Sequence, residues 1–305
     1  MMSRRDVAWL AGGAVGLSLA VVVAMGWSSL GPGVLGLERG RGPRAGEVRR
    51  VALAEGVEME AVWVPGGTFE IGMTPSDVEE AADEAWGWSG EREELERRLR
   101  RDYPRRTVEG LKGFWMGRKE VTRREWASVT GEEEEAAVEG EAGEEPKTMV
   151  SWERCQEWLR WLNERLEAEG TGLHARLPTE EEWERAARGA TMGSGYRYSG
   201  GDDPGVAGWY VKNAAGRVHR TGGKAGNELG LLDMSGNVSE WCDAMPMNTE
   251  TGDVLREDLR VLRGGSWKDP SLKCHVAVRD WLPVDARRGW AGLRVVFEER
   301  GAERQ

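Results

Sequence analysis

The sequence predicts an α+β domain, rich in loops and poor in regular secondary structure, that follows an N-terminal transmembrane helix. Short alternating apolar runs bounded by glycines indicate strands, for example at 62–64 and 259–263. Two longer segments, 151–169 and 179–189, carry an apolar stripe at helical spacing behind a capping residue. From 191 to 230 glycine dominates and neither period is present, which indicates a long irregular region.

The N-terminal segment is expected to anchor the chain in a membrane. Residues 7–27 carry no charge, and a helix of that length spans a bilayer. Because this apolar run is longer than that of a cleaved signal peptide, we assign 1–28 to an uncleaved signal-anchor. Arg4 and Arg5 favour a cytoplasmic N-terminus and an extracytoplasmic, periplasmic domain, whereas five arginines between 39 and 50 oppose export.

The rest of the sequence divides into a linker and one domain. Residues 29–57 are rich in Gly, Pro and Arg and predict a flexible linker. The domain is assigned to 58–300. Near its start, a strand at 62–64, a turn at 65–67 and a strand at 68–71 predict a hairpin.

A charged helical insertion is predicted at 76–101. Ser76 with Glu79 has the pattern of a capping box. Two glycines divide the segment, and 91–101 is expected to form a second helix. The buried contacts of the insertion are expected to be Trp86, Trp88, Leu95 and Leu99.

The middle of the domain predicts a strand and three capped helices. The strand covers 114–116. Thr122 is expected to cap a helix to 129, and Ser151 a helix to 169. Thr179 with Glu182 forms a second capping-box pattern, for the helix that ends near 189.

Composition and charge exclude several classes of function. A net charge of −11 argues against nucleic-acid binding, which needs a basic surface. The three cysteines, Cys155, Cys242 and Cys274, form at most one disulfide, and no Cys/His spacing suits structural zinc. Most of the sixteen tryptophans are expected in the core.

Residues 230–241, GLLDMSGNVSEW, are the strongest candidate for a metal site. Asp233 and Glu240 supply carboxylates, and Gly236 allows a sharp turn that points carbonyls inward. Oxygen ligands of this kind suit calcium. The alternative is a tight turn in which Asp233 bonds its own backbone and Glu240 is solvated.

Seven ordered segments, including this one, resemble the formylglycine-generating enzyme family, also called sulfatase-modifying factor domains. The other six read VPGGTFEIGM at 64–73, EVT at 120–122, VSW at 150–152, RLPTEEEW at 176–183, VLRGGSW at 261–267 and GLRVVF at 292–297. The resemblance implies that family's fold, which is loop-rich and C-type-lectin-like. It also implies a calcium site in which Asp233 and Glu240 bind through side chains, and Gly236 and Val238 through carbonyls.

The same resemblance identifies where oxidase chemistry would lie. In the family's oxidases, two cysteines five residues apart follow the Arg-Gly-Gly-Ser segment and hold copper(I), which activates oxygen. Counted from Ser266, the second cysteine matches Cys274 and the first falls on Asp269. Cys274 and Ser266 are therefore the candidate catalytic residues, but a carboxylate is a poor copper(I) ligand and the pair is broken. His275 is an alternative ligand, and the other interpretation makes Cys274 a small buried residue.

Two functions follow from the resemblance. The first is a membrane-anchored, calcium-stabilised binding or accessory module, whose partners are the membrane and a protein or peptide ligand. The alternative is an oxidase that converts a sulfatase cysteine to formylglycine with a non-standard site at Cys274. The broken cysteine pair favours the first. A retroelement-diversified receptor would need an Asn/Tyr/Ser-rich stretch after Arg263, which 268–274 lacks.

Overall fold

The computed structural model describes residues 42–89, 92–132 and 143–300. The predicted signal-anchor at 1–28 lies outside these ranges. Within them, no helix combines the length and the apolar character needed to cross a bilayer. The ordered fold begins earlier than predicted: strand β1 (Val48–Ala54) lies inside the expected linker 29–57, because its alternating side chains Val51 and Leu53 are buried in the core.

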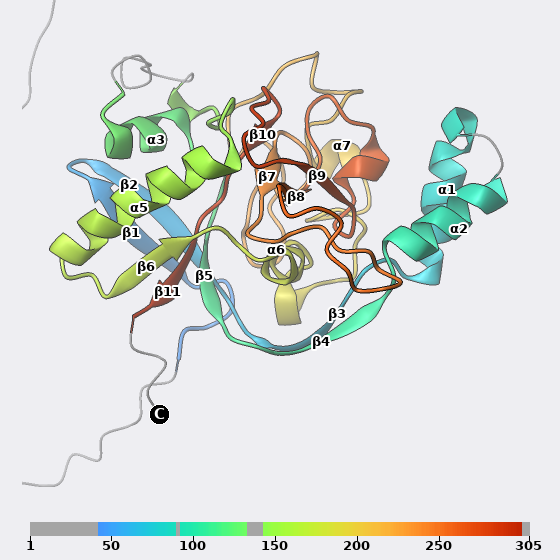
Figure 1. The fold of residues 1–305 in the computed structure, drawn as a ribbon, viewed down its shortest axis with the longest axis horizontal. Coiled ribbons are helices and arrows are strands. Elements are labelled where there is room, and N and C mark those ends of the chain that lie inside the picture. The colour runs from blue at the N-terminus through green and yellow to red at the C-terminus, as the bar shows by residue number, and fades with distance from the viewer. Residues whose placement is uncertain (1–41, 90–91, 133–142, 301–305) are drawn as a thin grey trace, which may run out of the picture. The chain divides into compact units, whose positions relative to one another are not determined.

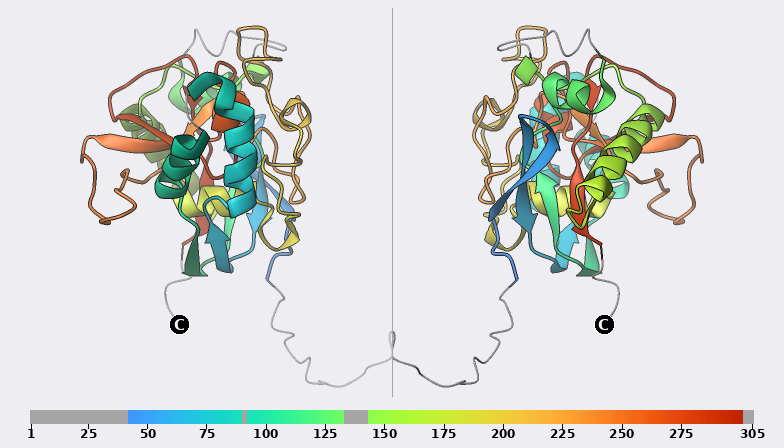
Figure 2. Two further views of the ribbon diagram at one scale, coloured as in Figure 1. Left: turned by 90° about the vertical axis from the view of Figure 1, so that its right-hand side faces the viewer. Right: turned by 90° about the vertical axis from the view of Figure 1, so that its left-hand side faces the viewer.

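A five-stranded antiparallel sheet forms one part of the core (Figure 1). Its strand order is β1, β2 (Val57–Val64), β5 (Phe114–Gly117), β11 (Val296–Glu299) and β6 (Leu173–Arg176). Helices α3 (Arg123–Thr130) and α5 (Trp152–Ala168) lie beside this sheet (Figure 2, right). Trp126 and Trp158 stack between these two helices at 5.6 Å, so tryptophan fills this core, as expected.

A second, smaller sheet carries the signature segment. Its order is β10 (Ala291–Gly292), β7 (Ser239–Trp241), β8 (Leu259–Arg263) and β9 (Arg279–Pro283). The register places Glu240 opposite Arg263. Helix α6 (Glu180–Ala187) packs against β8, and the 3-10 helix η3 (Ser271–Cys274) lies between β8 and β9.

The predicted hairpin at 62–71 is wrong. Strand β2 pairs with β1 and β5, whereas β3 (Gly67–Ile71) pairs with β4 (Arg106–Leu111) in a separate two-stranded ribbon. Gly66 explains the divergence, because a Cβ there would lie 2.1 Å from the Leu111 carbonyl oxygen. The chain therefore turns against β4 and does not fold back on β2.

Helices α1 (Pro75–Ser89) and α2 (Arg92–Asp102) form the predicted insertion, between β3 and β4. The capping residue is Thr74 and not Ser76: Asp77 N–H donates to Thr74 Oγ1 at 3.1 Å, and Thr74 N–H donates to Asp77 Oδ2 at 2.7 Å. Leu95 and Leu99 are buried as predicted. The predicted burial of Trp86 and Trp88 concerns side chains that the structure does not describe.

The other capping predictions are confirmed. Thr122, Ser151 and Thr179 are the N-caps of α3, α5 and α6, and the first and last of these form complete capping boxes. Between α6 and β7 the chain is irregular apart from η2 (Ala190–Met192) and α7 (Pro204–Ala207). A buried asparagine, Asn227, ties this region down, donating to Ala186 O at 2.8 Å and accepting from the Leu229 N–H at 3.1 Å.

Candidate functional site

The signature segment 230–241 forms a tight left-handed turn that leads into β7. Asp233 and Asn237 have φ values of 56° and 55°, which short polar side chains tolerate better than most. A Cβ on Gly236 would lie 2.2 Å from the Trp209 carbonyl oxygen, so this position requires glycine. The turn directs Asp233, Asn237 and Glu240 into the protein, where all three are buried.

Glu240 is neutralised by the guanidinium of Arg294. Arg294 Nε lies 3.0 and 2.9 Å from the two carboxylate oxygens, and Nη2 lies 2.7 Å from one of them. Trp183 Nε1 donates to the same carboxylate at 2.6 Å. Arg294 also donates to the carbonyls of Gly117 and Leu232, at 2.9 and 2.8 Å. Arg294 is thus fully buried and holds two loop carbonyls as well as Glu240.

Two further carboxyl groups, Glu120 and Asp233, lie near this ion pair. Glu120 accepts from Asn237 Nδ2 at 3.1 Å and is fully buried. Asp233 accepts from the Gly222 N–H, but its Oδ1 has no hydrogen-bond partner among the described residues. Burial raises the pKa of Glu120, and the charges of Asp233 and Glu240 raise it further; burial also raises the pKa of Asp233.

The two carboxylates predicted to bind calcium differ in how far their oxygens are already engaged. Both oxygens of Glu240 already accept from Arg294, so a cation would have to displace a buried guanidinium. Of the two carboxylates, only Asp233 has an oxygen without a partner in the part of the chain described. Nor do the described ranges contain three or more His, Cys, Asp or Glu side chains grouped so that they could hold a metal. The guanidinium of Arg294 therefore supplies positive charge beside the predicted calcium ligands.

Cys274 lies apart from the other two cysteines. It is buried beside Tyr198 and Ala207, whereas Cys155 and Cys242 belong to different apolar clusters. Burial raises the pKa of the Cys274 thiol, and the nearby Asp269 and Glu84 raise it further. A thiol held in its protonated form is a poor nucleophile and a poor metal ligand.

The bend after β8 brings Ser266 and Asp269 close to Cys274. Ser266 Oγ donates to Asp269 Oδ2, and Lys268 Nζ lies 3.1 Å from Asp269 Oδ1, so both carboxylate oxygens are occupied. One protonated thiol beside a carboxylate does not fit copper(I), which prefers a pair of thiolates. His275 does not replace the missing ligand: its Nδ1 accepts from the Ala277 N–H, and its Nε2 lies 3.7 Å from Asp77 Oδ1.

Helix α1 packs over the segment that contains the thiol (Figure 2, left). Glu84 accepts hydrogen bonds from Ser271 Oγ and from the Tyr198 hydroxyl, the latter at 3.3 Å. Residues Val78, Ala81, Ala82, Leu95 and Leu99 form an apolar cluster with Ala277 and Val278. The insertion thus contacts the chain on both sides of Cys274.

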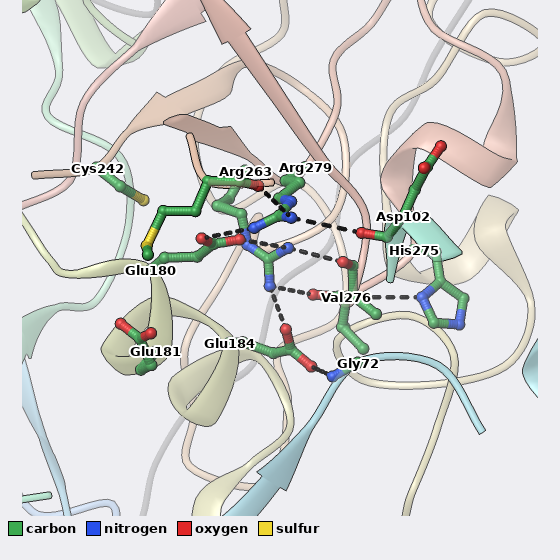
Figure 3. A network of polar contacts seen from close by, with 12 residues as sticks. Gly72, Asp102, Glu180, Glu181, Glu184, Cys242, Arg263, His275, Val276 and Arg279 are labelled. Carbon is green, nitrogen blue, oxygen red and sulfur yellow. Dashed lines mark hydrogen bonds and ion pairs between the residues drawn. The ribbon is translucent and has the colours of Figure 1, made fainter. Parts of the chain in front are cut away.

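A second buried network surrounds Arg263 (Figure 3). Arg263 donates to Glu184 and to the carbonyls of Val276 and Ala277, at 2.9 and 2.8 Å. Burial raises the pKa of Glu184, but Arg263 and Arg188 outweigh it and the net shift is downward. The network joins α6, β8 and the chain after η3, so Arg263 has a structural role.

Several residues of these networks were not singled out by the sequence analysis. Glu120 and Glu184 are buried carboxylates, and Glu84 contacts the thiol segment from a distant insertion. Glu184 lies on the same face of α6 as the buried Ala187, three residues later. This helical spacing is the one sequence pattern that could have predicted that Glu184 is buried. No local sequence pattern predicts the contacts of Glu120 and Glu84, because their hydrogen-bond partners, Asn237 and Ser271, lie far away in the sequence.

Comparison with known proteins identifies relatives of this chain. Residues 50–299 match the model of the Sulfatase-modifying factor enzyme 1-like domain. The Chaperone protein LppX of Paenibacillus barcinonensis is 29% identical over 232 residues, which cover 61% of this chain and 80% of that protein. The Inactive C-alpha-formylglycine-generating enzyme 2 of Bos taurus is 32% identical, over 41% of this chain and 39% of its own length.

A catalytic relative and a solved structure also match. The Formylglycine-generating enzyme of Streptomyces coelicolor is 32% identical over 174 residues, which cover 49% of this chain and 51% of that enzyme. The match therefore spans about half the length of that enzyme. The structure of Treponema denticola variable protein 1 superposes with a TM-score of 0.64, at 22% identity, over 82% of this chain and 98% of its own. That likeness concerns the fold alone.

Proposed function

The chain belongs to the sulfatase-modifying factor family, and from that premise we propose that it is a binding or accessory protein without the family's oxidase chemistry. The observation that carries the proposal is the isolation of Cys274. Its thiol is buried and protonated, and the neighbouring acidic residue, Asp269, is hydrogen-bonded to Ser266. A site that activates oxygen through copper(I) needs two thiolates, and the surroundings of Cys274 supply one thiol.

The position of helix α1 over the segment that contains Cys274 supports the same proposal. An oxidase of this family must admit a substrate cysteine to the metal. Here Glu84 of α1 bonds Ser271 and Tyr198, both of which lie close to Cys274. A peptide would have to displace these contacts to reach the sulfur.

The relatives include both classes of function. One carries the name of a chaperone and one of an inactive enzyme, whereas the Streptomyces coelicolor protein is a formylglycine-generating enzyme. Because the names point in both directions, the proposal depends on the residues of this chain. Those residues favour binding over oxidation.

Membrane attachment is a further part of the proposal. An uncleaved anchor at 1–28 would hold the domain at a membrane, and Arg4 and Arg5 favour an extracytoplasmic position. A fusion of the full chain to a periplasmic reporter enzyme should be active in cells and recovered with membranes. Activity of a cytoplasmic reporter fused at the same site would contradict this orientation.

The test of function is an oxidation assay. The purified protein is incubated with copper(I), oxygen and a Cys-x-Pro-x-Arg peptide, with an active formylglycine-generating enzyme as positive control. Mass spectrometry should show the peptide thiol unchanged by this chain and converted by the control. Conversion by this chain would overturn the proposal and favour the alternative, an oxidase with a non-standard site at Cys274.

A further inference from the structure

Two grooves meet along the segment between β7 and β8. The first, of about 490 Å³, is bordered by α6, the start of β4 and residues 244–254. The second, also about 490 Å³, is bordered by the end of α2, by β9 and by residues 247–255. Six residues line both grooves: Asp102, Tyr103, Met247, Asn248, Thr249 and Arg279. The two grooves therefore adjoin along these shared residues, and we call the pair the 245–255 groove.

The 245–255 groove has a preformed apolar rim. Met245, Met247, Val254, Leu255 and Trp281 are each at least 40% exposed and gather along the groove, whereas exposed apolar side chains are more often scattered singly. The segment is nevertheless ordered, since Met247 and Val254 form a β-bridge and the Asn248 N–H donates to Asp253 O at 2.8 Å. Thr249 Oγ1 further fastens it to the Arg101 carbonyl at 2.5 Å. Flexible thioether side chains on an ordered loop adapt to different apolar partners.

An edge strand lies along the second groove. Three consecutive residues of β9, namely Arg279, Asp280 and Trp281, line it, and β9 is the outer strand of its sheet in the described structure. An extended chain placed there can add its backbone to such an edge, while the side chains of alternate residues enter the groove.

Charge differs between the two ends of the groove. The first end carries Glu180, Glu181 and Glu184. Glu180 and Glu184 are buried and paired with Arg263, so the accessible acid of this end is Glu181, which pairs with Arg106 at 2.6 Å. The second end carries the bases Arg98, Arg101 and Lys273 and the acids Asp102, Glu250 and Asp280. Arg101 pairs with Asp102 at 2.9 Å and Lys273 with Asp280 at 3.2 Å, which leaves Arg98 as the exposed base of this end. Arg106, Glu181, Lys273 and Asp280 are solvent-accessible, and such exposed ion pairs contribute little to stability and can exchange partners.

We propose that the 245–255 groove binds an extended peptide segment of a partner polypeptide, with apolar residues in its middle and opposite charges at its two ends. The basic end of the segment lies at Glu181, and its acidic end lies at Arg98. The inference rests on the proposed function, because it names the class of ligand that a binding protein of this kind would take. It does not involve Cys274.

The test uses the purified full chain and fluorescein-labelled peptides of about ten residues, long enough to span several side-chain positions as a strand. The first peptide has two lysines at one end, two glutamates at the other and alternating leucines between. The second has the same composition with the charges intermixed, and the third replaces the leucines by serines. Fluorescence anisotropy should show the first peptide binding about tenfold more tightly than either of the others.

Variants locate the site. Met247→Ser and Trp281→Ala should each weaken the first peptide about fivefold or more, and Glu181→Lys should remove its preference over the intermixed peptide. Met192→Ser is the matched control, because Met192 is equally exposed outside the groove and should leave binding unchanged. Circular dichroism of each variant checks that the fold is retained.

Other results would overturn the inference. Equal binding of the three peptides, or full binding by Met247→Ser, excludes the groove as a peptide site. Self-association that Met247→Ser abolishes would assign the groove to a second copy of the chain. Absent peptide binding together with absent oxidation would reject the groove and leave the proposed function standing, whereas oxidation of the Cys-x-Pro-x-Arg peptide would reject the proposed function itself.

Discussion

Arg294 bridges both carboxylate oxygens of Glu240 at 2.7–3.0 Å, in a part of the domain where neither side chain reaches solvent. The same guanidinium holds carbonyls of two distant loops, those of Gly117 and Leu232. The arginine therefore acts as an internal cation that organises irregular backbone.

We expect Glu240→Gln to be strongly destabilising. The substitution keeps the size of the side chain but leaves a buried guanidinium without its counter-ion, which costs about 3–5 kcal/mol in other buried pairs. Urea denaturation measures the change in the free energy of unfolding. The control is Glu298→Gln, which removes the half-exposed pair with Arg176 and should cost about 0–1 kcal/mol. Similar losses for the two variants would contradict the role given to Arg294.

Asp233→Asn should stabilise the protein at neutral pH. Asparagine tolerates the positive φ, and its amide can donate to the neighbouring carboxylate of Glu120 where two like charges now repel. A gain of about 1 kcal/mol is expected from one such hydrogen bond. Thermal denaturation with and without a calcium chelator measures it, with the exposed Asp243→Asn as control. If calcium were bound, the variant would instead lose stability and the chelator would lower the melting temperature of the wild type.

The pH dependence of that gain follows from the direction of the pKa shifts. Folding raises the pKa values of Asp233 and Glu120 above their ordinary values of 3.8 and 4.5. The folded state therefore binds a proton on each of these two carboxyl groups more tightly than the unfolded state does. The stability that this protonation contributes is lost as pH rises through the folded pKa values. The advantage of Asp233→Asn over the wild type should consequently shrink as pH is lowered towards 4.

Local sequence signals predicted much of the framework. The capping boxes at Thr122 and Thr179 were readable because cap and partner lie three residues apart. Strand β8 was readable from its apolar alternation. The hairpin prediction failed at Gly66, where the backbone of β4 approaches too closely for a side chain. Strand β4, the actual partner of β3, follows helices α1 and α2 in the sequence, so no local pattern indicates this pairing.

The candidate site was predictable only in part. The sequence marked Asp233 and Glu240 as carboxylates of a candidate site, and both are buried. It could not show that Arg294, 54 residues from Glu240, would take both of that residue's oxygens. Likewise, the family's cysteine spacing predicted that Asp269 lies near Cys274. The hydrogen bond from Ser271 to Glu84 could not be predicted, because Glu84 lies 187 residues before Ser271 in the sequence.

Asp77→Asn should destabilise the protein above about pH 4. Burial raises the pKa of Asp77, but His275 and Thr74 outweigh it and lower the value to about 2, from 3.8. A depressed folded pKa contributes stability above the unfolded value, and that contribution is lost as pH falls towards 2. The shift corresponds to roughly 2 kcal/mol. Asparagine keeps the acceptor for the Thr74 N–H, so the substitution removes chiefly the charge. Asp83→Asn on the same helix is the exposed control, and equal pH profiles for the two variants would contradict the assignment.

Opening the contact between Glu84 and its partners should expose the thiol. In the wild type, Cys274 is about 2% exposed and protonated, so an alkylating reagent should label it slowly under native conditions. Glu84→Ala removes the acceptor of the Ser271 and Tyr198 hydrogen bonds, which frees α1 to move from the segment and should raise the labelling rate about tenfold. Peptide mapping by mass spectrometry assigns the label to Cys274, and Cys155, buried in a different cluster, serves as the internal reference. A rise at both cysteines would mean general loosening of the fold. An unchanged rate at Cys274 would show that α1 does not control access to the thiol.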